Sequence, residues 1–377
     1  MSRSHKYAVG MMALAGIMWA GTCQASKLKK ARFTIQTPKG CDVPVRNRAL
    51  LPSHDRVYLW VELHDVRAGD RYEYRWYDPS GKPHYSKTFT RPKDAARACT
   101  FNWIKIAGQA AANLQGLWKV QLYHNGQKVL TKRVRLLEDL IRFQRGTVPI
   151  ILSAPHGGHL GIEGVPERSR SDATTSTDTR TLEVTEAAAH RFAILKGRRP
   201  TVVAAKMDRK YLDLNREHRW SRPFKTSQGL EDPKALPYYN AYHDTLKAMV
   251  AEAKAKWRKP LLIDIHGQAT DRKTIHRGTA DGATLATLTN KTLLRPTGLF
   301  GALRGLGYTI YPTVDGAPEA TSFNGGFIVR NYGGAGDSAL DAVQIEIGRH
   351  LRMKYNWKSV ANALGRAIKI HYDHHIK

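Results

Sequence analysis

The chain has 377 residues, of which 42% are hydrophobic and 24% are charged, so it can bury a sizeable core and wholesale disorder is excluded. This length allows two domains. The formal net charge of +28 favours a polyanionic partner: an anionic cell surface, an acidic polymer or nucleic acid. Nucleic acid is the least favoured of these, because the sequence has no recognition-helix or zinc-finger pattern. The other interpretation of the charge is solubility alone.

The first 25 residues predict an export signal. Arg3 and Lys6 precede an apolar run from Tyr7 to Ala20, and small residues follow up to Ala25. This pattern is typical of a secretory signal that is cleaved after Ala25, and the apolar run is short for a membrane span. We therefore expect a periplasmic or secreted protein without a transmembrane segment in its mature chain.

The cysteines fit export. Removal of the signal would leave Cys41 and Cys99 as the only two cysteines, and an even pair in an oxidising compartment predicts one disulfide. Two buried free thiols are the alternative. Cys23 leaves a lipid anchor open, although Ala20-Gly21-Thr22 is a poor lipobox.

Residues 26–140 are expected to form an all-β accessory or binding domain. Apolar residues alternate over 57–63, and aromatic residues alternate with charged ones over 71–77. Asn125-Gly126 lies between two further alternating runs and is a strong hairpin signal. Several short strands in about 100 residues predict an immunoglobulin-like β-sandwich. Its exposed aromatic side chains could stack on sugars or pack the sandwich.

Residues 141–377 alternate between strand and helix patterns and form the expected catalytic domain. The strand candidates are 148–152, 201–206, 260–266, 308–312 and 343–347, and the helix candidates are 181–196, 234–256, 283–290, 297–306 and 357–371. This alternation predicts an α/β fold in which helices sandwich a mixed sheet. Ligands of such sheets bind beyond the strand ends.

Two histidines lie at such strand ends. His156 follows the first strand in Ser-Ala-Pro-His-Gly-Gly, and His266 follows the apolar run 261–265. A catalytic zinc ion takes three His, Asp or Glu ligands and leaves one position open for water. We interpret both histidines as zinc ligands, although a single such histidine is as often structural. Asp264, two residues before His266, could orient an imidazole or cap the strand.

The third zinc ligand is open at this stage. Asp178 precedes the helix candidate 181–196, where it would face the sheet end or cap the helix. Glu163 and His159 in the preceding loop are the alternatives, and Asp178 is the preferred one.

Eight motifs then occur in one order. They are 153–158 (Ser-Ala-Pro-His-Gly-Gly), Asp178 with Thr181 and Glu183, Arg209 with Asp-Leu-Asn-Arg at 213–216, Tyr242-His243, 264–267 (Asp-Ile-His-Gly), 323–328, Tyr332-Gly333, and 344–347 before Arg349. With them, residues 147–353 resemble the N-formylglutamate amidohydrolases, relatives of the zinc carboxypeptidases and aspartoacylase. The resemblance implies a zinc-peptidase-like α/β/α fold and hydrolysis of an amide next to a carboxylate. The export signal, the β-domain and the positive charge set the chain apart from the family's cytoplasmic catabolic enzymes.

The chemistry assigns further roles. Glu346, a carboxylate in the strand pattern 343–347, is our candidate for taking a proton from the attacking water and returning it to the leaving amine. An ion pair of Glu346 with Arg349 or Arg352 is the alternative role.

A basic segment supplies candidates for substrate binding. Asn215 and Arg216 would hold the substrate carboxylate, because a guanidinium binds a carboxylate through two hydrogen bonds. Arg209 would polarise the carbonyl or stabilise the oxyanion. His243 either reaches the site or packs behind it. The alternative for the arginines is a solvated basic turn.

We therefore expect an exported zinc-dependent amidohydrolase that acts on an N-formylglutamate-like, γ-glutamyl or peptidoglycan-type substrate, small or polymeric. The alternative is a non-catalytic protein that binds the cell envelope or another anionic polymer, with a structural or degenerate metal site. The usual His-x-x-Glu spacing of zinc carboxypeptidases is missing, which keeps this alternative open.

Overall fold

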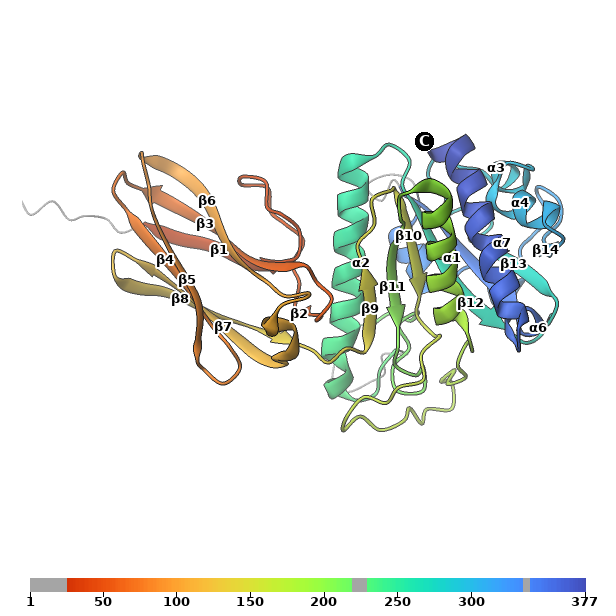
Figure 1. Ribbon diagram of the computed structural model, residues 1–377, viewed down its shortest axis with the longest axis horizontal. Coiled ribbons are helices and arrows are strands. Elements are labelled where there is room, and N and C mark those ends of the chain that lie inside the picture. The colour runs from red at the N-terminus through yellow and green to blue at the C-terminus, as the bar shows by residue number, and fades with distance from the viewer. Residues whose placement is uncertain (1–25, 219–228, 335–339) are drawn as a thin grey trace, which may run out of the picture.

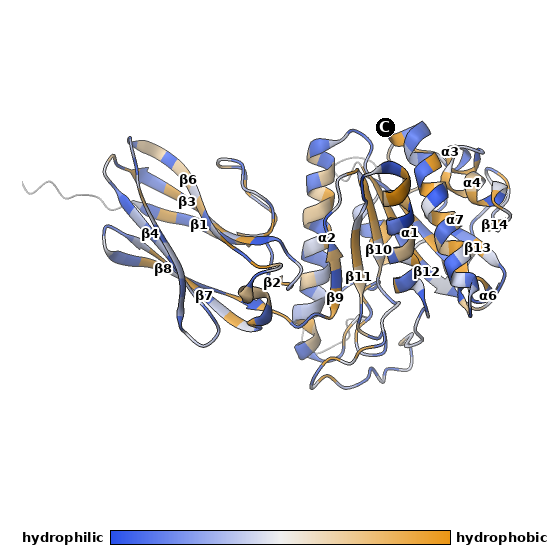
Figure 2. Ribbon diagram, viewed as in Figure 1, coloured by the Kyte–Doolittle hydropathy of each residue, from blue (hydrophilic) through white to orange (hydrophobic). Residues whose placement is uncertain are grey.

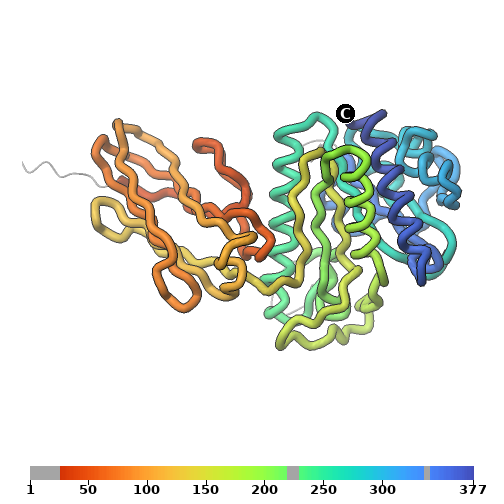
Figure 3. Tube along the Cα trace, viewed as in Figure 1, coloured from red at the N-terminus to blue at the C-terminus, as the bar shows by residue number. Residues whose placement is uncertain are grey.

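The computed structural model describes residues 26–218, 229–334 and 340–377 and contains a β-sandwich beside an α/β unit (Figure 1). The predicted export signal and Cys23 lie outside the described residues. Within the described part, no helix combines the length and the apolarity that crossing a bilayer requires. The chain passes once from one unit to the other, as the trace in Figure 3 shows, through the segment between Leu136 and Ile141.

Two mostly antiparallel sheets make up the sandwich. A three-stranded sheet has the order β1-β3-β6 and a five-stranded sheet the order β2-β8-β7-β4-β5. The strands are β1 (Lys27–Thr34), β2 (Ala49–Leu50), β3 (Arg56–Val66), β4 (Arg71–Tyr77), β5 (Pro83–Thr90), β6 (Ala95–Lys105), β7 (Gly116–His124) and β8 (Gln127–Leu136). Among these eight described strands, only β2 and β8 pair in parallel. The immunoglobulin-like assignment of this sandwich stays a prediction.

Alternation of side chains fills the space between the two sheets. Trp76 and Trp118 of the five-stranded sheet are buried, and the indole N–H of Trp76 donates to Asn102 of β6 at 2.8 Å across the sandwich. The turn between β7 and β8 is Asn125-Gly126, with φ of 48° and 84°. Positive φ at both positions is what a two-residue hairpin turn requires, so the hairpin prediction is confirmed.

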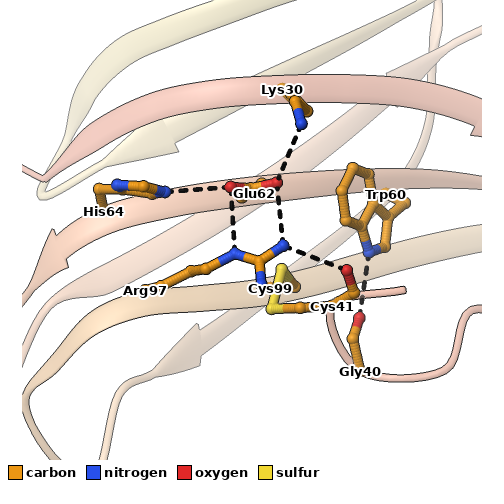
Figure 4. The surroundings of a disulfide bond; sticks show 8 residues. All are labelled: Lys30, Gly40, Cys41, Trp60, Glu62, His64, Arg97 and Cys99. Atoms are coloured by element: carbon orange, nitrogen blue, oxygen red, sulfur yellow. Dashed lines mark hydrogen bonds and ion pairs between the residues drawn. A yellow bond between two sulfur atoms is a disulfide. The ribbon is translucent and has the colours of Figure 1, made fainter. Parts of the chain in front are cut away.

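A disulfide joins Cys41 to Cys99 of β6 (Figure 4). Beside it, Glu62 accepts hydrogen bonds from Arg97 at 3.1 Å and from His64 at 3.0 Å. Trp60 donates to the carbonyl of Gly40 at 3.1 Å. The disulfide and this hydrogen bond therefore fix the segment around residue 41 over the buried Trp60.

The α/β unit is built on a mixed sheet of seven strands with the order β14-β13-β15-β12-β10-β11-β9. The strands are β9 (Ile141–Gln144), β10 (Ile150–Ala154), β11 (Thr201–Ala205), β12 (Leu261–Gln268), β13 (Thr274–Gly278), β14 (Thr309–Tyr311) and β15 (Asp341–Gly348). The helices are α1 (Thr181–Lys196), α2 (Leu236–Lys256), α3 (Asn290–Leu294), α4 (Leu299–Gly305), α5 (Phe327–Tyr332), α6 (Arg349–Arg352) and α7 (Asn356–His371). The predicted α/β class is confirmed.

The central strands are apolar on both faces, as the colouring of Figure 2 shows for β10 and β11. Alternate residues of the sheet, such as Ile263 and Ile345, enter a core with α1, α4 and α7. The residues between them face α2, where Leu262 belongs to a second core. Burial on both faces explains the continuous apolar runs that predicted these strands.

Helix α2 lies between the sheet and the sandwich (Figure 1). On the sandwich side, Arg48 donates to both carboxylate oxygens of Asp244, and His54 lies 3.0 Å from the hydroxyl of Thr245. On the sheet side, the hydroxyl of Tyr242 lies 2.7 Å from that of Ser153. One hydrophobic core therefore includes residues of the sandwich, of α2 and of the sheet.

One predicted helix, 283–290, is wrong. Asp341 of β15 accepts hydrogen bonds from the backbone N–H groups of Ala286, Thr287 and Leu288 at 2.8–2.9 Å, so this segment folds as a loop around a carboxylate. Helix α3 begins only after Thr289, whose hydroxyl caps it.

Three buried histidines predict that acid destabilises the fold. Burial lowers the pKa of His54 to about 3, of His243 to about 4 and of His371 to about 3. Between about pH 6 and pH 4 the unfolded chain takes up protons at these rings and the folded chain does not. We expect the free energy of unfolding to fall by about 1.4 kcal/mol per histidine for each pH unit in that window. Urea titrations at stepped pH measure it.

His371→Leu tests the origin of this pH dependence. Neither ring nitrogen of His371 has a hydrogen-bond partner within the described residues, so the substitution removes the titrating ring without breaking a hydrogen bond. The variant should lose the contribution of one histidine, about 1.4 kcal/mol per pH unit, between pH 6 and pH 4. An unfolding free energy that does not change over this range would contradict the prediction.

Candidate metal centre

Three buried side chains converge at the carboxyl ends of β10 and β12. Ligand atoms of His156, Asp178 and His266 all lie within 4.8 Å of one another. Asp178 Oδ2 is 3.5 Å from His156 Nδ1 and 3.2 Å from His266 Nδ1. The two histidines meet because β10 and β12 are parallel neighbours, so their carboxyl ends lie at the same edge of the sheet.

Two glycines allow the chain to turn away after His156. A Cβ on Gly157 would lie 2.3 Å from the backbone nitrogen of Leu182, and one on Gly158 would lie 2.1 Å from the backbone of Lys206. The loop therefore passes directly against α1 and the end of β11, where no side chain fits. This close approach is the physical reason for Gly-Gly after the histidine.

Asp178 is the carboxylate that joins the histidines. Its Oδ2 accepts the backbone N–H of Gly267 at 3.0 Å, and its carbonyl accepts the hydroxyl of Thr181 at 2.8 Å. The side chain points to the candidate metal cluster and does not cap α1. Glu163 and His159, the alternative ligands, are exposed and lie outside the cluster.

Each histidine is held from behind by another carboxylate. His156 Nε2 lies 2.7 Å from Asp213 Oδ1, and His266 Nε2 lies 2.7 Å from Asp264 Oδ2. The Nδ1 atom of each ring faces Asp178 on the other side. This carboxylate–histidine arrangement is typical of metal ligands. Asp264 lies as the sequence predicted, whereas the contact of Asp213 with His156 was missed.

The residues fit a divalent metal ion. Two imidazole nitrogens and one carboxylate are the donor set of a catalytic zinc site. Within the described residues, the buried His156 Nδ1 has no hydrogen-bond partner. A metal ion would satisfy this atom, which otherwise loses its hydration without compensation.

Electrostatics hold the carboxylates ionised. Burial alone would raise the pKa of Asp178, but its contacts with His156 and His266 outweigh burial and lower the pKa. Burial would also raise the pKa of Asp213, but the nearby His156 and Arg209 outweigh burial and lower this pKa. Both carboxylates are therefore anionic at neutral pH and can bind or orient cationic partners.

Arg209 and Asp213 form a buried pair. The Nε and Nη2 atoms of Arg209 donate to Asp213 Oδ2 at 3.0 and 2.8 Å. Arg209 thus fixes the carboxylate that holds His156. The predicted action of Arg209 on the substrate carbonyl stays a prediction.

The other predicted substrate-binding residues adjoin the cluster. Asn215 Nδ2 lies 3.2 Å from His266 Nε2, and Asn215 Oδ1 accepts the N–H of Ile328 at 2.8 Å. Arg216 is partly exposed and donates to the carbonyl of Asn215 at 3.0 Å. His243 lies behind this segment, where its Nε2 is 3.0 Å from the carbonyl of Leu214.

Glu346 lies next to the cluster on β15. It is directly paired with His266 of β12, and its Oε1 accepts the amide of Gln344 at 3.0 Å. Burial raises its pKa to about 7, although His266 opposes the shift. The alternative ion pairs are not formed: Arg349 is exposed, and Arg352 donates to carbonyl groups such as that of Ile347 at 2.9 Å.

His276 was missed by the sequence analysis. It is paired directly with Glu346 from the other side, so His266, Glu346 and His276 form one row across three strands. Its strand, β13, is short and polar and lacks the periodicity that would have predicted it. Within the described residues, the buried Nδ1 of His276 has no hydrogen-bond partner.

Asp213→Asn should weaken metal binding by about 10- to 100-fold, because the amide cannot both accept from His156 and satisfy Arg209. Chelator competition, read by elemental analysis, measures the affinity. Asp208→Asn is the matched control, since Asp208 lies in the same segment and binds Thr177. Equal affinities for the two variants would contradict the orienting role of Asp213.

Among solved structures, the N-formylglutamate amidohydrolase from Ralstonia eutropha JMP134 is 17% identical, with a TM-score of 0.45, and the match covers 61% of this chain and 95% of that one. An alkylpurine DNA glycosylase from Pseudomonas fluorescens is 15% identical over 30% of each chain, with a TM-score of 0.22. A β-glucuronidase from Parabacteroides merdae is 14% identical over 35% of this chain and 18% of that one, with a TM-score of 0.20.

No curated protein matches the chain. The family model described as N-formylglutamate amidohydrolase matches residues 148–353, which is more than half of the 377 residues. The matched region includes the metal cluster and Glu346.

Proposed function

The chain belongs to the N-formylglutamate amidohydrolase family, and from this premise we propose that it is an exported, zinc-dependent hydrolase of an amide bond next to a carboxylate. The observation that carries the proposal is the convergence of two carboxylate-held histidines on Asp178, beside the buried Glu346. A binding protein needs no such arrangement of a metal site next to a proton-carrying group.

Glu346 is the proposed general base and acid. A bound zinc ion would supply Lewis acidity toward a water molecule and the scissile carbonyl. Burial raises the pKa of Glu346, which favours a carboxylate that accepts a proton from water and then releases it to the leaving amine. The hydrogen bond from Gln344 fixes the orientation of this carboxylate.

Arg216 is the stronger candidate for holding the substrate carboxylate. The side-chain amide of Asn215 already contacts His266 and the N–H of Ile328, so Asn215 chiefly positions the segment. Arg216 is partly exposed next to it and retains donors for a carboxylate. His243 supports the segment through the carbonyl of Leu214.

Export and the choice of substrate rest on the sequence. The first 25 residues support a periplasmic or secreted location, and the charge of +28 supports an acidic substrate, small or polymeric. Membership of the family supports an amide bond as the bond that is cleaved.

Elemental analysis of the mature chain (26–377) tests the proposal, together with its His266→Ala variant and assays on formyl- and γ-glutamyl-amides. We expect about one zinc ion per wild-type chain, little zinc in the variant, and amine release by the wild type alone. A wild-type chain that takes up no zinc after reconstitution would refute the metal mechanism. A chain that binds zinc but cleaves none of these amides would favour the binding-protein alternative.

A further inference from the structure

The five-stranded sheet of the sandwich has one buried and one outward face. Tyr72, Tyr74 and Trp76 of β4 point into the sandwich core, so the alternate residues of β4 and the residues paired with them point outward. We call this set the outer face: Arg71, Glu73, Arg75 and Tyr77 of β4, Leu117, Lys119, Gln121 and Tyr123 of β7, and Lys128, Thr131, Arg133 and Arg135 of β8.

The outer face is strongly cationic. It carries six lysine and arginine side chains and a single carboxylate, that of Glu73. Glu73 is already bound by Arg75, whose Nε and Nη2 donate to it at 2.6 and 3.0 Å. Within the described residues, no carboxylate lies at ion-pair distance from the other five cations. Their charge is therefore available to an anionic ligand.

Two of the cations are ordered against tyrosine rings. Lys119 Nζ lies 4.2 Å from the ring centroid of Tyr77, and the guanidinium of Arg75 lies 4.2 Å from that of Tyr123. Such contacts restrict long side chains, so less conformational entropy is lost when a ligand binds.

One end of the outer face adjoins the α/β unit. Arg135 lies next to Leu136, the last residue of β8, and the chain enters β9 at Ile141. Arg135 and Glu163 both act electrostatically on Tyr238 of α2, whose pKa burial raises. Glu163 belongs to the segment between His156 and Asp178. This end of the outer face therefore lies toward the α/β unit, which carries the candidate metal cluster.

We propose that the outer face binds γ-linked polyglutamate and holds it for cleavage at the metal centre. This rests on the proposed function, which requires an amide next to a carboxylate. In a γ-linked chain, each free α-carboxylate sits on the carbon that bears the amide nitrogen, so one polymer supplies the cleavable bond and a regular series of anions. An α-linked chain consumes that carboxylate in its backbone.

Polymer binding is measured on the full mature chain carrying Glu346→Gln, so that the probe stays intact. The face variant adds Lys119→Gln, Arg133→Gln and Arg135→Gln, three adjacent positions of β7 and β8. The control adds Arg198→Gln, Lys291→Gln and Arg366→Gln, three exposed cations of the α/β unit, and changes the net charge equally. The probes are poly-γ-glutamate, poly-α-glutamate, polygalacturonate, polyphosphate and single-stranded DNA.

We expect the face variant to bind poly-γ-glutamate about tenfold more weakly and the control to differ about twofold or less. Equal losses in both variants would mean that total charge alone binds the polymer, which overturns the proposal. A tighter, face-dependent interaction with any of the other four probes would also overturn it.

Activity separates this proposal from the proposed function. In the background with Glu346 intact, the three face substitutions should slow cleavage of poly-γ-glutamate and leave hydrolysis of a small γ-glutamyl-amide unchanged. If the small amide is cleaved and the face variant binds and cleaves the polymer as the wild type does, the outer-face proposal is wrong and the proposed function stands. If the polymer binds through the face but neither substrate is cleaved, the proposed function fails and the binding surface remains.

Discussion

Replacing Glu346 by glutamine should lower kcat for amide hydrolysis by about a thousandfold and leave the zinc content at the wild-type level. Glutamine has nearly the same shape but cannot take up a proton from water. Glu346 is not part of the candidate metal cluster, so the variant keeps His156, Asp178 and His266. Steady-state kinetics on a small amide and elemental analysis of the same preparation measure both quantities.

Glu183→Gln is the matched control, because it makes the same chemical change in a carboxylate whose partner, Arg180, lies outside the cluster. Its kcat should remain close to that of the wild type. If Glu346→Gln retained a tenth or more of wild-type kcat, another group would have to carry the proton.

Removal of Glu319 should cost about 3–5 kcal/mol of unfolding free energy, because it leaves the guanidinium of Arg277 buried and uncompensated. Both side chains of this pair are fully buried, and Arg277 Nε donates to Glu319 Oε1 at 2.7 Å. Glu319 also accepts the backbone N–H groups of Thr279 and Asp281 at 2.7 and 3.0 Å. Urea denaturation of Glu319→Ala measures the loss.

The double variant Arg277→Met with Glu319→Gln separates the charge from the loop contacts. It removes both charges and keeps a side-chain oxygen for the N–H groups, so it should be more stable than Glu319→Ala alone. A loss below about 1 kcal/mol in Glu319→Ala would contradict the prediction, since it would mean that Arg277 finds other compensation.

The convergence of the three candidate metal ligands could be predicted because each of them depends on a local pattern. His156 and His266 each follow a buried apolar run, and such runs indicate strands whose ends meet in an α/β sheet. Asp178 precedes a helix pattern and could be placed near them. The glycines after His156 also indicated a close backbone approach, and Gly157 and Gly158 show one.

The residues that support the ligands depend on contacts between distant segments. Asp213 reaches His156 across 57 positions of sequence, and no periodicity indicates such a contact. His276 depends on the antiparallel pairing of β13 with β15, which a short polar strand does not predict. The wrong helix at 283–290 has the same cause, because the carboxylate of Asp341 that folds this segment as a loop lies more than 50 positions away.

Helix α2 is covered on two sides, and 12 of its 21 residues are buried. Asp244, Thr245 and Ala248 contact the sandwich, while Tyr242 contacts β10 and β11. Cutting the chain at residue 141 would strip one side of this helix and leave the carboxylate of Asp244 without its arginine. The sandwich therefore covers one side of α2 and shares a hydrophobic core with it, so the α/β unit should be less stable on its own than in the full chain.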